Sequence, residues 1–352
     1  ITNVASATCT ENDANPANNV ASAEVLVGLL GDVNGDGAVN VQDVFYLINY
    51  LFAGGPPPVG DRDVNRDAAL NVQDVFFLIN HLFAGGAAPP PLPQITVNLP
   101  GGVPLTLVRI PAGTFMMGSP ESERGRYAGE GPQHEVTLTE DYYLGKTEVT
   151  QAQWQAVMGT PALVEQCGAV GVGPNYPVYC VSWNDVCGGI TGSSCVPSSF
   201  IAKLNELLGT TKFRLPTEAE WERAARGGTT TEFSFAAPAG WDTMCGSFPE
   251  AAAYMSWCGT SSCLRHPVGL LQANPFGLDE MHGNQSEWVA DWWGAYPASA
   301  VVNPTGPAMA SFRVFRGGDS CYNARDCRSA TRGAMDSAGR YMNTGFRLAR
   351  SL

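Results

Sequence analysis

The sequence predicts an α+β fold, in which a small α-helical module with two repeated loops precedes a large and irregular domain. Three observations support this prediction. A length of 352 residues corresponds to about two domains. The 40 glycines and 25 prolines favour a loop-rich fold over a helical bundle. Residues 31–55 repeat as residues 62–86, and apolar side chains at helical spacing close each copy. The predicted segments are an N-terminal polar segment (1–30), the repeated module (31–86), a Pro-rich linker (87–104) and the large domain (105–352).

Composition excludes several classes of function. With 44% hydrophobic and 15% charged residues, the chain can bury a sizeable core. The formal charge of −13 opposes nucleic-acid phosphates and anionic membranes and favours cations, so no nucleic-acid partner is expected. The apolar runs are too short for a transmembrane segment. The chain starts at Ile1 with a polar segment, as expected of a mature secreted protein whose signal has been removed.

The repeat carries the ligand pattern of a calcium loop. Its two copies agree at 19 of 25 positions, so the duplication is real. Oxygen-bearing side chains occupy loop positions 1, 3, 5, 9 and 12, through which an EF-hand loop binds calcium. They are Asp32, Asn34, Asp36, Asn40 and Asp43 in the first copy, and Asp63, Asn65, Asp67, Asn71 and Asp74 in the second. Ala68 replaces the glycine of position 6 in the second copy, which makes its turn more costly. The pattern predicts one calcium ion in each loop, and an Asn/Asp-rich turn without metal is the alternative.

An amphipathic helix follows each loop, at residues 41–52 and 72–83, and each helix ends at a pair of glycines. No helix enters the second loop, because residues 54–60 contain three prolines. A duplicated loop with only an exiting helix resembles a type I dockerin. The resemblance implies a cohesin domain on another protein as partner, contacted by loop positions 10 and 11, which are Val-Gln in both copies. Because two short helices bury little surface, calcium should supply much of the module's folding free energy.

Ten cysteines favour disulfides and an oxidising compartment. Zinc is the alternative, but the chain has no C-x2-C pair, and its four histidines do not lie at ligand spacing from the cysteines. The sequence does not determine the connectivity. Short loops make three bridges reasonable: Cys167–Cys180, Cys187–Cys195 and Cys258–Cys263.

The large domain has short β-like stretches, Gly-rich turns and one well-marked helix start. Thr217 and Glu220 form a predicted capping box before an apolar run. No Ser/His/Asp order, HExxH motif or phosphate-binding loop stands out. Seven aromatic or imidazole side chains are interpreted as structural: Trp183, Trp221, Trp288, Trp292, Trp293, His134 and His282.

A series of motifs runs through the large domain. It includes residues 109–118 (RIPAGTFMMG), 146–150 (KTEVT), 214–222 (RLPTEAEWE), 283–288 (GNQSEW), 316–318 (RGG) and 345–347 (GFR). The series resembles the sulfatase-modifying factor family, that of the formylglycine-generating enzyme, over residues 105–350. The resemblance implies an irregular formylglycine-generating-enzyme-like fold, related to C-type lectin domains. It also implies one calcium ion, held by the carboxylates of Glu280 and Glu287 and the backbone carbonyls of Gly283 and Gln285.

The same resemblance bears on catalysis. The family's enzyme oxidises a substrate cysteine with copper held by two thiolates, in a C-x4-C arrangement shortly after Gly-Gly-Ser. Here Cys321 and Cys327 form a C-x5-C pair, and Asp319 stands in place of the serine. We therefore favour a structural disulfide between the two cysteines. Cys321, Cys327 and Asp319 are the residues to test for an oxidase, and copper is expected only in that case.

These observations favour a secreted, calcium-binding protein of the bacterial exterior or cell surface, whose large domain serves binding or assembly without catalysis. Its partner would be a cohesin-like domain, or neighbouring copies of itself in a filament. A glycan or protein ligand would bind around residues 319–343, which are rich in Asp, Asn, Tyr and Arg. One alternative is a copper-dependent oxidase that makes formylglycine on sulfatase cysteines. Another is a dockerin-borne accessory module of a polysaccharide-degrading complex.

Overall fold

The structure is a computed structural model that describes residues 31–34, 39–56, 58, 64, 70–83, 92–188, 195–242 and 245–352. The chain forms two compact units: residues 1–91 with 226–236, and residues 92–225 with 237–352. In the described part of the chain, no helix is both long and apolar enough to cross a membrane. Several predictions lie outside the described residues: the N-terminal segment 1–30, and the calcium ligands Asp36, Asp63, Asn65 and Asp67.

The two predicted helices of the smaller unit are α1 (Val41–Ala53) and α2 (Val72–Phe83). Each begins after an asparagine whose side-chain oxygen accepts a hydrogen bond from the amide two residues on. Asn40 and Asn71 both make this bond at 2.7 Å. Helix α1 ends at Gly54, whose φ of 70° lies in the left-handed region that favours glycine. Local caps thus explain why the helices begin where the loops end.

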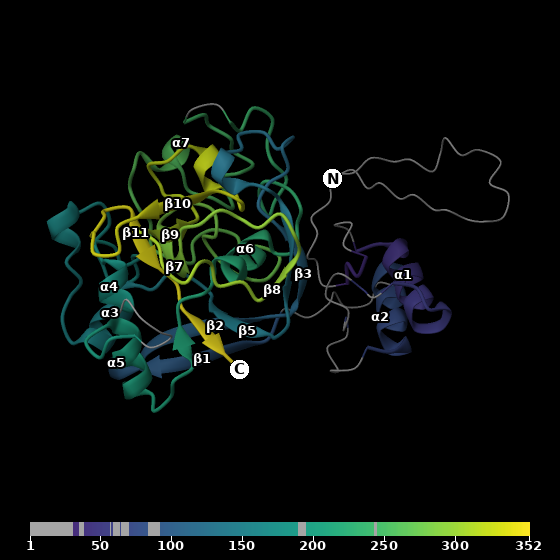
Figure 1. The fold of residues 1–352 in the computed structure, drawn as a ribbon, viewed down its shortest axis with the longest axis horizontal. Coiled ribbons are helices and arrows are strands. Elements are labelled where there is room, and N and C mark those ends of the chain that lie inside the picture. The colour runs from purple at the N-terminus through teal and green to yellow at the C-terminus, as the bar shows by residue number, and fades with distance from the viewer. Residues whose placement is uncertain are drawn as a thin grey trace. The chain divides into compact units, whose positions relative to one another are not determined.

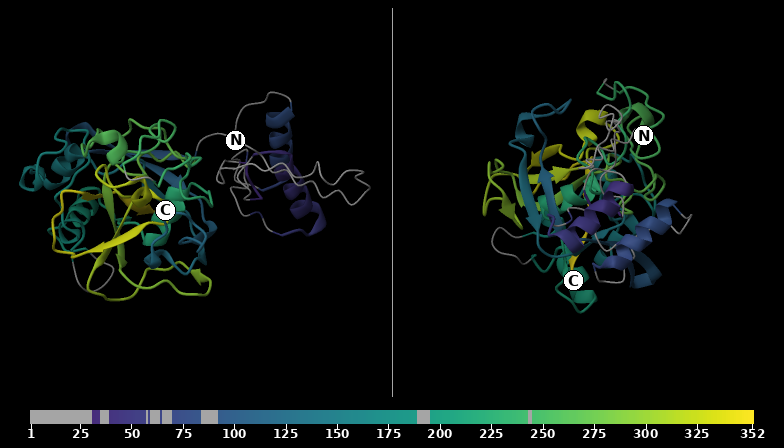
Figure 2. Two further views of the ribbon diagram at one scale, coloured as in Figure 1. Left: turned by 90° about the horizontal axis from the view of Figure 1, so that it is seen from above. Right: turned by 90° about the vertical axis from the view of Figure 1, so that its right-hand side faces the viewer.

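The two helices use one apolar face for packing and leave a second one exposed. They lie side by side in both views of Figure 2. Of the described residues, six apolar side chains are buried in the core between them: Val33, Val44, Leu47, Val64, Val75 and Leu78. A second apolar row on each helix faces solvent: Val41, Phe45, Ile48 and Phe52 on α1, and Val72, Phe76, Ile79 and Phe83 on α2. Residues at this spacing share one helix face, so we call these two rows the apolar stripes.

The described part of the larger unit contains three sheets of short strands. The strands are β1 (Gln94–Leu99), β2 (Val103–Ile110), β3 (Gly113–Met117), β4 (His134–Leu138), β5 (Tyr142–Gly145), β6 (Phe213–Arg214), β7 (Ser286–Trp292), β8 (Val301–Val302), β9 (Arg313–Arg316), β10 (Arg332–Met335), β11 (Thr344–Phe346) and β12 (Ala349–Ser351). The sheets have the orders β1-β2-β5-β12-β6, β10-β9-β7-β11 and β3-β4-β8. Most neighbouring strands are antiparallel, whereas β11 runs parallel to β7 and β8 parallel to β4.

The helices of this unit are short. They are α3 (Gln151–Met158), α4 (Trp183–Val186), α5 (Phe200–Leu207), α6 (Glu218–Arg226) and α7 (Cys258–Ser261), with 3-10 turns at Pro100–Gly102, Ala128–Glu130, Val164–Cys167 and Ala324–Cys327. Figure 1 shows α3, α4 and α5 gathered at one end of the unit, beside β1 and β2. The predicted capping box begins α6, because Glu220 N donates to Thr217 Oγ1 at 3.1 Å and Thr217 N donates to the Glu220 carboxylate at 2.8 Å.

Strand β7 joins two apolar cores of the larger unit. Val289 belongs to the core that surrounds Trp221 of α6, whereas the adjacent Trp288 belongs to the core around Phe346 of β11. Successive side chains of a strand point to opposite faces, which places one residue in each core. Trp183, Trp221 and Trp288 are at most 5% exposed, which confirms their interpretation as core residues. Trp292 and Trp293 are half-buried. Strand β7 is therefore anchored in both cores.

Candidate functional site

Four disulfides link cysteines of the larger unit: Cys167–Cys180, Cys187–Cys195, Cys245–Cys258 and Cys263–Cys321. The first two are bridges predicted from short loops. The predicted Cys258–Cys263 bridge is wrong. Cys258 begins the one-turn helix α7 and Cys263 follows its end, so the two bond different partners. The long-range bridge joins cysteines 58 residues apart.

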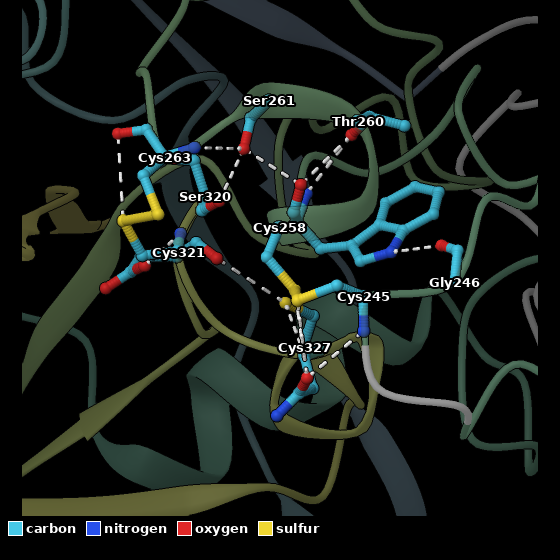
Figure 3. Close-up of a disulfide and its surroundings, with 12 residues drawn as sticks. Cys245, Gly246, Cys258, Thr260, Ser261, Cys263, Ser320, Cys321 and Cys327 are labelled. Carbon is cyan, nitrogen blue, oxygen red and sulfur yellow. Dashed lines mark hydrogen bonds between the residues drawn. A yellow bond between two sulfur atoms is a disulfide. The ribbon is translucent and has the colours of Figure 1, made fainter.

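The predicted Cys321–Cys327 disulfide is also wrong. Cys321 bonds Cys263, and Cys327 is a buried free thiol at the end of the 3-10 turn 324–327. That turn directs the thiol inward against Gly318, where an added Cβ would lie 2.7 Å from Cys327 Sγ. Figure 3 shows the Cys263–Cys321 disulfide and the separate thiol of Cys327.

The Cys327 thiol is held in its neutral form. Burial raises its pKa well above the ordinary value, and the nearby carboxylates of Asp319 and Asp326 raise it further. Copper(I) binds thiolates, and the sulfur of Cys321 is already in a disulfide. A two-thiolate copper site therefore does not fit Cys321 and Cys327. Asp319 is buried and accepts a hydrogen bond from Cys321 N at 2.5 Å, so it orients this loop, and burial raises its pKa.

Glu287 stands near the start of β7 and is fully buried. Arg347 donates to both of its carboxylate oxygens at 2.7 Å, and Trp221 Nε1 donates to Oε2 at 2.6 Å. Arg347 directly follows β11, so the parallel pairing of β7 and β11 brings the two charges together. The result is a buried ion pair that neutralises the carboxylate. The Gly-Phe-Arg motif contains Arg347, but no pattern in the sequence assigns its partner.

Glu280 lies in the loop before β7, and its carboxylate is bonded to backbone amides instead of an arginine. Its carboxylate accepts hydrogen bonds from the amides of residues 269–271, at 2.9 to 3.3 Å. No three His, Cys, Asp or Glu side chains of the described residues form a group that could hold a metal ion. Calcium at Glu280, Glu287, Gly283 and Gln285 stays a prediction, and the ion would have to share Glu287 with its arginine partner.

In the smaller unit, the last predicted ligand of each calcium loop is buried and bonded to the loop backbone. The Asp43 carboxylate accepts hydrogen bonds from the amides of Val33 and Asn40, both at 2.8 Å. Asp74 makes the equivalent bonds at 2.7 and 2.9 Å, so the described parts of the two loops fold alike. In the first loop these bonds, with one from Asn34 N, link three of the predicted ligands: Asn34, Asn40 and Asp43. Asp32, which precedes Val33, is also buried.

The histidines interpreted as structural are hydrogen-bonded to backbone. His134 Nδ1 lies 3.1 Å from Pro132 O, and His282 Nδ1 lies 2.8 Å from Cys327 O. Both side chains are buried, at 3% and 2% exposed. The sequence interpretation of these two residues is confirmed, and His282 also positions the turn that carries the free thiol.

A cavity of about 290 Å³ opens beside Gly317 and Gly318, and residues of the segment 319–343, which is predicted to display a ligand surface, form part of its wall. Tyr127 and Asp326 line it, and Tyr127 Oη donates to Asp326 Oδ1 at 2.7 Å. Burial, followed by this hydrogen bond, raises the pKa of Tyr127 to about 12. The guanidinium of Arg325 lies 3.9 Å from the centre of the tyrosine ring. Sequence reasoning missed Tyr127, because it comes 199 residues before its partner and carries no local motif.

Comparisons with known proteins agree with this architecture. The family model described as "Sulfatase-modifying factor enzyme 1-like domain" matches residues 102–352, and that of the dockerin type I domain matches residues 30–83. The formylglycine-generating enzyme of Thermomonospora curvata is 30% identical and covers 69% of this chain and 92% of its own. The enzyme of the same name from Bos taurus is 28% identical, with 72% and 77% covered. Among solved structures, Treponema denticola variable protein 1 has a TM-score of 0.61 at 28% identity, and covers 74% of this chain and 99% of its own.

Proposed function

We propose a function that proceeds from one premise: the chain belongs to the family of the sulfatase-modifying factor enzyme 1-like domain, through residues 102–352, and carries a dockerin type I domain at residues 30–83. In this proposal it is an extracellular calcium-binding protein. Its dockerin domain docks onto a partner, and its larger unit binds a ligand without oxidising cysteines. The four disulfides support the extracellular location, because such bonds persist in oxidising compartments.

One observation carries the non-catalytic part of the proposal. The Cys263–Cys321 disulfide occupies the first cysteine of the C-x5-C pair and leaves Cys327 as the free thiol of the described residues. Copper held by two thiolates needs both sulfurs deprotonated and facing one ion. A disulfide sulfur has no proton to lose, and the remaining thiol is buried with a raised pKa. The sulfurs of Cys321 and Cys327 therefore suit a structural role better than copper binding.

We expect no oxidation of a sulfatase peptide by the purified protein. The full chain is reconstituted with Cu(I) under oxygen and incubated with a peptide that contains Cys-x-Pro-x-Arg. Mass spectrometry then measures formylglycine, with the Thermomonospora curvata enzyme as the positive control. Peptide mapping of the same sample should find Cys263 and Cys321 in one disulfide.

Conversion of the peptide would favour the copper oxidase instead, provided that Cys321→Ser abolishes it. The matched control is Cys187→Ser together with Cys195→Ser, which removes a disulfide distant in sequence from this pair. If the control variant lost conversion equally, the loss would reflect unfolding, and a contaminating activity would be tested by repurification.

The apolar stripes support docking through the smaller unit. Phe45 and Phe76 are 62% and 63% exposed, and both belong to stripes of four apolar residues on one helix face. Such a surface is unfavourable in water and is typical of a protein interface. A cohesin-like domain or the stripes of neighbouring copies would cover it. Self-association would build the filament, and a cohesin would favour an accessory role in a polysaccharide-degrading complex.

For the filament, we expect the chain to associate in calcium and to become monomeric when Phe45→Glu and Phe76→Glu are combined. Two carboxylates in an apolar interface would lose their hydration without gaining a partner. Light scattering measures the mass, and Phe45→Leu with Phe76→Leu is the control that keeps the apolar surface. A monodisperse wild-type monomer in calcium would contradict the filament and leave docking onto a cohesin-like domain.

A further inference from the structure

A second cavity lies away from the cysteine loop, on the far end of β7. Its volume is about 530 Å³, within the range of small-molecule sites. Its walls are mainly apolar and aromatic, with Trp292, Tyr296, Val301 and Pro304 among them. It includes none of the cysteines or predicted calcium ligands. Apart from Arg332, which also lines the smaller cavity, a ligand in this cavity would therefore be recognised by other groups than one at the cysteine loop.

Asp291 supplies a buried carboxyl group to this cavity. The residue is 4% exposed and belongs to β7. Its Oδ2 accepts a hydrogen bond from Glu218 N, the first amide of α6, at 2.7 Å. Among the described residues, Oδ1 has no hydrogen-bond partner. It points toward Gly306, another residue of the cavity wall, where an added Cβ would lie 3.1 Å from Oδ1. One oxygen is thus fixed by the helix and the other is open to the cavity.

The charged groups around Asp291 make their hydrogen bonds and ion pairs to other residues. Glu218 receives two hydrogen bonds from Arg332, at 2.7 and 2.6 Å, and one from Tyr296 Oη at 3.1 Å. Glu220 pairs with Arg214. Arg313 Nη1 donates to Ala290 O at 2.6 Å, and His134 Nδ1 contacts a backbone carbonyl. Among the described residues no ion pair reaches Asp291, and Arg313 and Arg332 act on its charge only at longer range. A cation in the cavity would therefore be its first direct partner.

Burial and the neighbouring carboxylate of Glu218 raise the pKa of Asp291 to about 8. The hydrogen bond from Glu218 N and the charge of Arg332 oppose this shift, and Glu220 adds to it. The carboxyl is therefore mostly protonated at neutral pH and ionises above about pH 8. A cation beside Oδ1 would favour the ionised form, because an opposite charge within a few ångströms lowers a carboxyl pKa.

We propose that this cavity binds an organic ammonium, a protonated amine on an apolar stem, which donates a hydrogen bond to Asp291 Oδ1. The apolar walls suit the stem, and the carboxylate neutralises the ammonium in a site that excludes water. The net charge of −13 favours the approach of cations. The proposed site does not depend on whether the domain oxidises cysteines, because its wall contains neither Asp319 nor any cysteine.

Binding of the ammonium should release a proton from Asp291, so the affinity should rise with pH. In the free protein the carboxyl must lose its proton before it can pair with the ammonium. From a pKa of about 8, the ionised fraction rises from ~3% at pH 6.5 to ~75% at pH 8.5, so the affinity should rise about 25-fold. The amine itself stays protonated over this range.

The experiment is isothermal titration calorimetry of the full chain with 2-phenylethylamine at pH 6.5 and 8.5. Two buffers of different ionisation enthalpy measure the proton release, and 2-phenylethanol is the neutral isostere. Nα-acetyl-lysine methylamide tests whether the ammonium comes from a lysine side chain of a partner protein. Binding of either amine, stronger at pH 8.5 and weaker for the alcohol, supports the proposal. The preferred amine identifies the source.

Asp291→Asn keeps an oxygen for Glu218 N but removes the charge. We expect it to lose at least tenfold in amine affinity at pH 8.5 and to bind with no pH dependence. The matched control is Asp336→Asn, which removes an exposed carboxylate. The proposal is overturned if neither amine binds, or if the alcohol binds as tightly as the amine. It is also overturned if wild-type affinity falls as the pH rises, since a protonated carboxyl would then be the hydrogen-bond donor. The wild-type pH series needs no variant, so the test holds even if Asp291→Asn fails to fold.

Discussion

Replacing Glu287 with glutamine should lower the free energy of unfolding of the larger unit by about 3–5 kcal/mol. Glu287 and Arg347 are both fully buried, and the variant leaves the arginine charge without its carboxylate. Desolvation of an unpaired charge is far more costly than the loss of one hydrogen bond. Urea unfolding followed by tryptophan fluorescence measures the effect, once with excess calcium and once with a chelator.

Comparing the two conditions shows whether Glu287 stabilises the protein through its ion pair with Arg347 or as a calcium ligand. An equal loss of stability in calcium and in chelator identifies the pairing with Arg347 as the role of Glu287. A loss only in calcium would instead make Glu287 a calcium ligand and would contradict the importance that we assign to the ion pair. Arg124→Gln is the control, because its pair with Asp242 is exposed and should contribute only about 0–1 kcal/mol.

Removing calcium should unfold helices α1 and α2 while the sheets of the larger unit stay folded. In the described part of the smaller unit the helices share a small core, with six buried apolar side chains, so little apolar burial offsets the entropy of the chain. A bound ion at one hundred times its Kd contributes about 2.7 kcal/mol, and the sequence predicts two ions. Hydrogen exchange of the full chain, followed by mass spectrometry, should show lost protection at residues 41–53 and 72–83.

Asp43→Ala combined with Asp74→Ala should have the same effect in the presence of calcium. Both carboxylates are predicted ligands and also hold the loop backbone, through bonds of 2.7 to 2.9 Å. Asn80→Ala is the control, since this exposed side chain lies outside both loops. Protection that persists in chelator would contradict a calcium-dependent fold and would favour the metal-free Asn/Asp-rich turn.

Features encoded by local sequence were predicted correctly. Helices α1 and α2, the capping box of α6 and the two short disulfides each depend on residues close together in the chain. A cap needs only a side chain and an amide two or three residues away, and a short loop brings its two ends together at little entropic cost.

Contacts between distant segments could not be predicted in this way. The Glu287–Arg347 ion pair exists because β11 pairs in parallel with β7, and no residue near either strand specifies that register. The Cys263–Cys321 bridge likewise depends on where the chain after α7 passes the Gly317 loop. Asp291 was missed because its relevant property is a carboxyl group held by the first amide of α6 at the wall of a cavity, which only the packing of β7 against α6 creates.

The strand order of the five-stranded sheet determines when, during synthesis, this sheet can be completed. Strand β12 lies between β5 and β6, and Tyr142 of β5 pairs with Ser351 of β12. During synthesis, β5 and β6 would therefore be made long before the strand that joins them, and each would keep an open edge until residues 349–351 arrive. Exposed edges of this kind promote aggregation of nascent chains, so we expect newly made protein to depend on chaperones until synthesis has passed β12.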